Sequence, residues 1–185
     1  ALGVPVDADM AACLYTGIAT DTGCFKYSNT TPKTHLMAAR LMECGAPADA
    51  INREMFDMKS RARLEIERQA LAGIRFAFGD RCAVMTITRK MISDAGAAEG
   101  DLEGLAPLPR QIEGVWVGVT MREKEDGRYK VSLRTGTHAD ASKICARLGG
   151  GGHVCAAGCT VSGSAQEAVD TVLSAIAAEL PEITA

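Results

Sequence analysis

A run of four glycines followed by a histidine is the first segment whose residue types could do chemistry. Gly149 to Gly152 precede His153 in ARLGGGGHVCAAGC, residues 146–159. One glycine after a helix is an ordinary end cap, but consecutive glycines let the backbone approach a ligand and turn several N–H groups toward one anion. The imidazole of His153 could then donate a hydrogen bond to a phosphate oxygen. The alternative is a tight helix-to-strand crossover in which these residues bind no ligand.

A second candidate lies just upstream, in VSLRTG, residues 131–136. Arg134 ends a segment with a strand pattern, and a guanidinium there suits bidentate recognition of a phosphate. Thr135 adds a hydroxyl. By itself Arg134 is an ordinary surface arginine, but a glycine run one short helix later makes a phosphate site plausible. The glycine run is not a nucleotide-binding P-loop, because neither Lys-Ser nor Lys-Thr follows it.

A third candidate is Asp21 in GIATDTG, residues 17–23. It follows an apolar helical pattern, so it is either a turn-forming residue or a metal ligand. A Mn²⁺ or Mg²⁺ site needs several oxygen or imidazole ligands. The nearest histidine, His35, lies on the next predicted helix. The residues themselves leave both interpretations of Asp21 open.

Composition limits the possible partners. The 185 residues include 20 Lys and Arg against 23 Asp and Glu, a net charge of −3, which argues against a protein that coats duplex DNA. Aromatic residues make up only 4%, so extended base-stacking platforms are not expected. The seven cysteines are odd in number and scattered, which favours reduced core thiols in a cytoplasmic protein. No apolar run reaches the ~20 residues of a membrane span, and no signal peptide is recognised.

Helical patterns fill the first part of the chain. One helix is predicted to begin after Asp7 or Asp9 and to end near Thr20. A second helix is predicted between Thr31 as cap and Gly45 as stop. A third, heavily charged helical segment covers residues 49–74. The apolar residues expected to face the core in these segments are Met10, Leu14 and Ile18, then Met37, Leu41 and Cys44, then Ile51, Met55, Met58 and Leu64.

After residue 73 the pattern changes to mixed strands and helices. Two strands are predicted around a turn at Gly79–Asp80, followed by a short helix at 89–97. Residues 115–135 form the clearest hairpin pattern, with a two-residue turn at Asp126–Gly127. A helix at 139–148, a strand at 156–162 and a closing helix capped by Ser164 complete the chain. The predicted fold class is therefore α/β, with a mixed sheet in the second part.

Three stretches together resemble the DHH phosphoesterase superfamily, in its RecJ-like branch of short-RNA nucleases that also act on 3′-phosphoadenosine-5′-phosphate. Residues 14–46 resemble the end of a DHH catalytic domain, and residues 104–135 and 144–161 resemble the DHH-associated domain. The resemblance implies three parts: a C-terminal portion of the α/β catalytic domain at 1–58, a linker helix at 59–72, and a substrate-binding domain at 73–185.

The family resemblance also implies site residues and a cofactor. Enzymes of this family hold two Mn²⁺ ions on Asp and His ligands, and Asp21 matches the last metal-binding, catalytic Asp. Arg134 and Thr135 match contacts to the substrate phosphate, although the family often has Ser at the second position. Gly150, Gly151, Gly152 and His153 match the substrate-binding loop. The Asp-His-His triplet is missing, since no two of the three histidines are adjacent. The chain is therefore expected to be part of a longer enzyme, inactive by itself, with the other metal ligands upstream.

Several functions remain open at this point. The expected partners are short single-stranded RNA or DNA, or a nucleoside bisphosphate, and a homodimer is possible. Relatives with the same glycine loop hydrolyse cyclic dinucleotides, so that substrate is an alternative. A nucleic-acid-binding module without catalysis, as in alanyl-tRNA synthetase, is a second alternative. An interaction domain whose glycine run is purely structural is a third.

Overall fold

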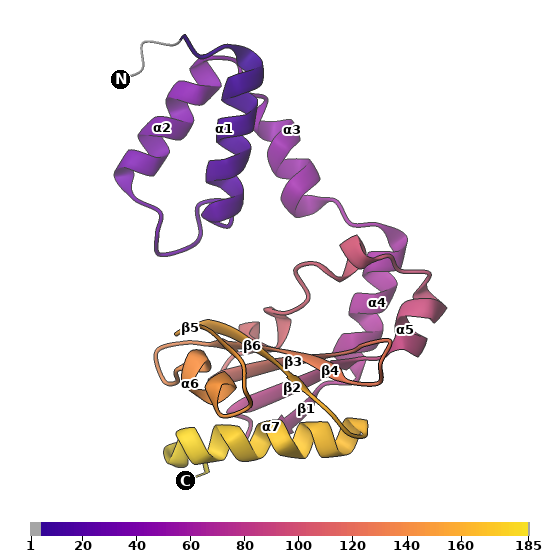
Figure 1. The fold of residues 1–185 in the computed structure, drawn as a ribbon. Helices are drawn as coiled ribbons and strands as arrows, with labels where there is room; N and C mark the ends of the chain where they lie inside the picture. The colour runs from indigo at the N-terminus through magenta and orange to yellow at the C-terminus, as the bar shows by residue number, and fades with distance from the viewer. Residues whose placement is uncertain (1–4, 185) are drawn as a thin grey trace. The chain divides into compact units, whose positions relative to one another are not determined.

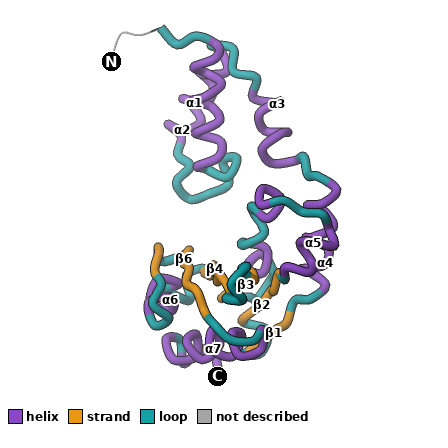
Figure 2. Tube along the Cα trace, turned by 45° about the vertical axis from the view of Figure 1, so that its right-hand side comes forward, coloured by secondary structure: helices purple, strands orange, loops and turns teal. Residues whose placement is uncertain are grey.

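The computed structural model describes residues 5–184 and divides the chain into two compact units, residues 1–59 and 60–185 (Figures 1 and 2). The start of the first predicted domain, residues 1–4, and residue 185 lie outside the described part. Among the described residues, no helix has both the length and the apolar character needed to cross a membrane.

The first unit consists of helices. They are α1 (Ala8–Asp21), α2 (Pro32–Glu43), and α3 (Ala48–Asn52) with a π-helical turn, η1 (Arg53–Asp57), directly after it. The predicted caps are confirmed. The side chain of Asp7 accepts a hydrogen bond from the Met10 N–H at 2.9 Å, and Thr31 caps α2 in a capping box with Thr34.

The buried faces of α1 and α2 differ from the predicted ones. Met10 and Leu14 are exposed, as is Met37 on α2, whereas Leu41 is buried as predicted. The residues of α1 with almost no exposure lie one position further along, at Ala11, Tyr15 and Ala19. One residue is a rotation of about 100° on a helix. The small residues Ala11 and Ala38 form the packed faces, because they let two helices approach closely.

The charged segment 49–74 is not one helix. After η1 the backbone becomes extended at Met58, and α4 (Arg61–Ala72) begins afresh with Ser60 as its N-cap. The side chains of Met55, Met58 and Leu64, predicted to form an apolar stripe, are all about half exposed. The residues that α4 buries are Ile66 and Ala70, which pack against β2 and the loop after α5 in the second unit. The helix predicted as a linker therefore belongs to the core of that unit.

The second unit is built on a six-stranded mixed sheet. Its order is β1-β2-β3-β4-β6-β5, with β2 and β3 parallel and every other neighbouring pair antiparallel. This confirms the predicted fold class. The strands are β1 (Arg75–Ala77), β2 (Cys82–Ile87), β3 (Val117–Glu123), β4 (Tyr129–Thr135), β5 (Gly151–His153) and β6 (Ala156–Val161).

Helices cover the two faces of the sheet unequally. The helices α6 (Ala141–Ala146) and α7 (Ala165–Glu179) pack on the face that carries Val119, Val131 and Leu133. On the other face, α4 and α5 (Arg89–Ala95) cover β2. Figure 1 shows α7 along one side of the sheet and α4 and α5 on the other. Along β4, residues 130, 132 and 134 alternate with buried residues, and none of the three is buried. They therefore lie on the face of the sheet opposite α6 and α7.

The β3–β4 hairpin has a three-residue loop rather than the predicted two-residue turn. The Lys124 N–H donates to the Arg128 carbonyl at 2.7 Å, and the Gly127 N–H donates to the Lys124 carbonyl at 3.1 Å. Gly127 has a φ of 76°, which glycine adopts readily. This combination is a type I turn followed by a left-handed residue, the usual three-residue hairpin connection.

Only part of the cysteine prediction agrees with the structure. Cys82, Cys145 and Cys159 are buried thiols, whereas Cys13 and Cys44 are exposed. Burial raises the pKa of the Cys82 thiol to about 12. Cys155 is also exposed, in the tight turn between β5 and β6. All seven cysteines are free thiols in this structure.

Candidate functional site

Arg134 and His153 lie in one row across the sheet. Arg134 of β4 is paired with Ala156 of β6, and Ala156 is paired with His153 of β5. Directly opposed residues of antiparallel strands point to the same face. Two strand spacings separate the Arg134 and His153 Cα atoms, about 10 Å. The two predicted phosphate-binding side chains therefore share one face of the sheet.

Both side chains are available for an anion. The guanidinium of Arg134 donates from Nη1 to the Leu133 carbonyl at 2.9 Å, and within residues 5–184 no carboxylate lies at ion-pair distance from it. His153 is exposed on the edge strand β5. An arginine with free donors and an imidazole on the same face, with β6 between them, are suited to bind a phosphate from two sides.

Half of the glycine run belongs to an edge strand: Gly151 and Gly152 are in β5, whereas Gly149 and Gly150 form the connection from α6. Gly152 has a φ of 150°, and a Cβ there would lie 2.6 Å from the Ala157 Cα. A Cβ at Gly150 would overlap the Gly158 carbonyl and lie 2.5 Å from the Cys159 Cβ. These two glycines are therefore required by the close approach of β6. A Cβ at Gly151 would meet no described atom within 4 Å. Packing against β6 therefore does not require glycine at this position of the predicted substrate-binding loop.

A buried thiol pair supports the start of the glycine run. The Gly150 N–H donates to the Cys145 carbonyl at 2.9 Å. A hydrogen bond to Cys159, together with burial, raises the pKa of the Cys145 thiol. A hollow of about 440 Å³ is lined by Gly149 and Gly150, together with Cys159 and Lys130. The start of the glycine run is thus anchored to α6 by its backbone and borders an open hollow.

Thr135 does not share the face of Arg134, contrary to its predicted role as a phosphate contact. Its side chain is buried, and its hydroxyl donates to the Val154 carbonyl at 3.0 Å. Because side chains alternate along a strand, the residue after Arg134 must point to the opposite face. The hydroxyl therefore positions the β5–β6 turn.

Asp21, the predicted metal ligand, ends α1 in the first unit. Its Oδ2 accepts a hydrogen bond from Asn29 Nδ2 at 3.0 Å, and Asn29 also donates to the Asp21 carbonyl. His35 stacks on the Phe25 ring, with ring centroids 5.0 Å apart. In the described part of the chain, no group of three or more His, Cys, Asp or Glu residues is placed to hold a metal ion. These residues do not supply the donor set that two Mn²⁺ ions need.

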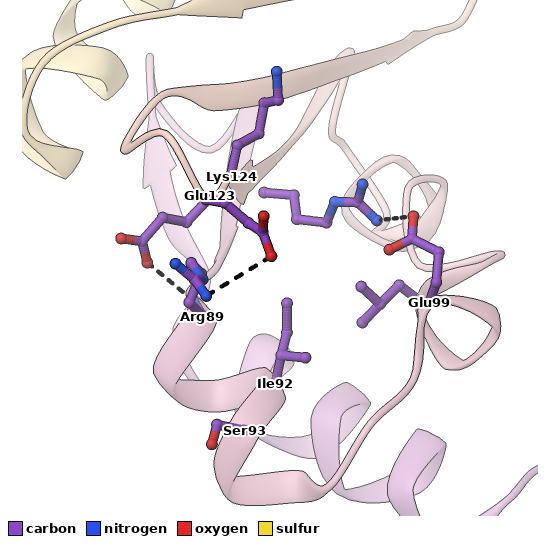
Figure 3. Close-up of a pocket in the computed structure, with 9 residues that line it drawn as sticks. Arg89, Ile92, Ser93, Glu99, Glu123 and Lys124 are labelled. Carbon is purple, nitrogen blue, oxygen red and sulfur yellow. Dashed lines mark hydrogen bonds and ion pairs between the residues drawn. The ribbon is translucent and has the colours of Figure 1, made fainter.

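A second hollow, of about 430 Å³, lies between α5 and the end of β3 (Figure 3). Arg122 and Glu99 form an ion pair at 2.6 Å across it. The backbone N–H of Arg89 donates to Glu123 Oε2 at 2.9 Å. The guanidinium of Arg89 lies 4.0 Å from the Glu125 carboxylate. Carboxylates thus balance both arginines here, so this hollow is less suited to an anion than the row of Arg134 and His153.

Two other polar residues of β4 lie on the same face and were not predicted from the sequence. Ser132 and Lys130 precede Arg134 by two and four residues on β4, and neither is buried. Lys130 is paired with Thr160 of β6, which is exposed. The alternation of the strand, counted back from Arg134, was the signal that could have identified them.

Comparisons with known proteins agree with this architecture. Residues 79–182 match the DHHA1 domain model. The bifunctional oligoribonuclease and PAP phosphatase NrnA of Thermus thermophilus is 40% identical over 181 residues, or 97% of this chain and 53% of the relative. A probable enzyme of the same name from Streptococcus mutans is 28% identical, covering 82% of this chain and 48% of the relative.

A solved structure also resembles the chain over nearly its full length. An exopolyphosphatase-related protein from Bacteroides fragilis aligns with a TM-score of 0.88 and 27% identity, covering 97% of this chain and 53% of that one. The chain thus spans about half the length of the relatives it matches. The chain belongs to the DHHA1 domain family, within the NrnA-like branch of the DHH phosphoesterase superfamily.

Proposed function

We propose that this chain carries the nucleotide-binding half of a phosphoesterase that acts on short oligoribonucleotides or on 3′-phosphoadenosine-5′-phosphate. The names of the Thermus thermophilus and Streptococcus mutans relatives support these substrates. The observation that carries the proposal is the row of Arg134 and His153 on one open face of the sheet. The two side chains would approach the phosphate of a small ligand from β4 and β5, the strands on either side of β6.

Hydrolysis would need more than this chain. In the proposed whole enzyme two Mn²⁺ ions would activate a water molecule and stabilise charge on the phosphorus. Asp21 would contribute one ligand, and the others would come from protein outside this sequence. The described residues offer no three-ligand group, so the chain by itself is expected to bind nucleotide without hydrolysing it.

Calorimetric titration tests the binding role. The chain is titrated with a 5′-phosphorylated RNA trinucleotide, with and without Mn²⁺. Binding should not depend on the metal, and His153→Ala and Arg134→Gln should each weaken it about tenfold, the effect of losing one charged hydrogen bond. Arg128→Gln is the control, since it removes one charge at the other end of the same hairpin, where Arg128 pairs with Asp126. Equal affinity in all four proteins would refute the proposed site.

A further inference from the structure

A second arginine lies on the same face of the sheet, far from Arg134 in the sequence. Arg110 belongs to the 3₁₀ helix η3 (Leu108–Gln111), which contacts β3. A Cβ at Gly118 of β3 would lie 2.5 Å from the Arg110 backbone N. At the other end of the side chain, a Cβ at Gly136 would overlap Arg110 Nη2. The Arg110 side chain therefore runs across the sheet from β3 to the residue that follows β4.

Both glycines are neighbours of Arg134. Gly118 is paired with Arg134 in the β3–β4 ladder, and Gly136 comes two residues after Arg134. Residues opposite each other in a ladder point to the same face, so Gly118 and Arg134 share one face. Gly136 directly follows the last residue of β4. Arg110 therefore flanks Arg134: its backbone packs on the cross-strand partner of Arg134, and its guanidinium lies where a Cβ of Gly136 would be.

Neither guanidinium is neutralised by the protein. In the part of the chain that the structure describes, no carboxylate lies at ion-pair distance from Arg110, and its buried Nε has no hydrogen-bond partner. Buried polar groups normally have a partner. Arg134 donates only to a carbonyl of its own strand. Two adjacent unpaired cations repel each other, and a shared anion would remove that repulsion.

We propose that Arg110 and Arg134 form a clamp for a terminal phosphomonoester of the nucleotide. The inference rests on the proposed function and adds the class of phosphate that is bound. A terminal phosphate carries a charge of about −1.5 to −2 at neutral pH and presents three oxygens, whereas an internal diester carries a single charge. Two guanidinium groups match the terminal group, because each can donate two parallel hydrogen bonds. His153 supplies a further donor from the other side of β6.

The test uses three RNA trinucleotides of one sequence, with a 5′-phosphate, with a 3′-phosphate, or with hydroxyls at both ends. The unaltered chain should bind at least one phosphorylated form about tenfold more tightly than the form without a terminal phosphate. Whichever form gains affinity identifies the end that is bound. Arg110→Gln should abolish this preference, because it removes one of the two guanidinium groups of the clamp. The control Arg128→Gln should keep the preference.

A second variant tests the geometry without removing a charge. Gly136→Ala places a methyl group where Arg110 Nη2 lies and should displace the guanidinium, so it should also abolish the preference. A preference that survives in both Arg110→Gln and Gly136→Ala would overturn the clamp. If Arg134→Gln still weakened all binding in that case, the proposed function would stand. Failure of the unaltered chain to bind any of the three RNAs would overturn the proposed function and the clamp together.

Discussion

The Thr135 hydroxyl donates a partly buried hydrogen bond of 3.0 Å to the Val154 carbonyl. The Thr135 N–H donates to the carbonyl of Cys155 at 3.1 Å, so one residue at the end of β4 holds both residues of the β5–β6 turn. His153 directly precedes that turn. Thr135 therefore contributes to the site by fixing the backbone that carries the imidazole.

Thr135→Val should lower the free energy of unfolding. The isosteric valine removes one of the two donors to the Val154 carbonyl, which still accepts from the Ala141 N–H at 2.7 Å. Loss of that one hydrogen bond should cost about 0.5–1.5 kcal/mol. Urea denaturation followed by Trp116 fluorescence measures this change in the second unit. Thr135→Ser keeps the hydroxyl and should lose less. Unchanged stability together with a large loss of RNA affinity would show that the hydroxyl contacts the ligand instead.

Gly152→Ala should destabilise the second unit, whereas Gly151→Ala should leave its stability unchanged. A methyl group at residue 152 would collide with Ala157 of β6, so Gly152→Ala should destabilise the second unit by about 1–3 kcal/mol. A methyl group at Gly151 meets open space, and Gly151→Ala should leave the urea midpoint unchanged. If the Gly151 backbone contacts phosphate, Gly151→Ala should still weaken RNA binding. Destabilisation by both substitutions would contradict the observed register of β5.

The β3–β4 loop should make stability depend on acid pH. Hydrogen bonds from the Arg128 side chain, and one from its backbone N–H, lower the pKa of Asp126 to about 2. In the unfolded chain that pKa is about 4. Between these values the unfolded state binds more protons, so stability rises with pH. The contribution of Asp126 is present above about pH 4 and is lost as the pH falls through its folded pKa.

Asp126→Asn removes this titration. Urea midpoints measured across the same acid range should therefore fall less steeply for the variant than for the unaltered chain. The two proteins should differ most above the unfolded pKa, where Asp126 is ionised in both states. Parallel pH profiles would contradict the ion pair between Asp126 and Arg128, whose atoms lie 2.7 Å apart.

The burial of α1 can be tested with two adjacent residues. Tyr15 is buried and its hydroxyl accepts a hydrogen bond from Asn52, so Tyr15→Ala should destabilise the first unit by about 3–5 kcal/mol. Leu14 is 51% exposed, and Leu14→Ala should change stability by less than about 0.5 kcal/mol. Far-ultraviolet circular dichroism follows the helices, while the single tryptophan, Trp116, reports the second unit. A larger loss of stability in Leu14→Ala than in Tyr15→Ala would show that the buried face of α1 is the one predicted from periodicity.

Removal of metal should not affect this chain. The described residues include no group of three potential ligands, so EDTA should leave both the urea midpoint and the RNA affinity unchanged. Added Mn²⁺ should not lead to cleavage of the RNA. Mn²⁺-dependent hydrolysis by the purified chain, abolished by Asp21→Asn, would show that the chain holds a metal centre of its own.

Local signals in the sequence predicted the elements well, because they depend on neighbouring residues. Thr31 and Pro32 start α2 by capping and by a preset backbone angle. Ser164 and Glu167 form the capping box that begins α7. The sequence also singled out Arg134 and His153 as candidates, because a guanidinium and an imidazole carry their chemistry in the side chain itself.

Only the tertiary structure decided which residues meet. Strand register placed Arg134 and His153 in one row and turned Thr135 inward. The packing of η3 brought Arg110 beside Arg134 across 24 residues of sequence, a proximity that no local pattern encodes. On α1, the stripe that contains Leu14 and the adjacent stripe that contains Tyr15 are both apolar. Packing against α2 determines that the Tyr15 stripe is the buried one. Pairing and packing join distant parts of the chain, so their outcome depends on partners that a sequence window does not contain.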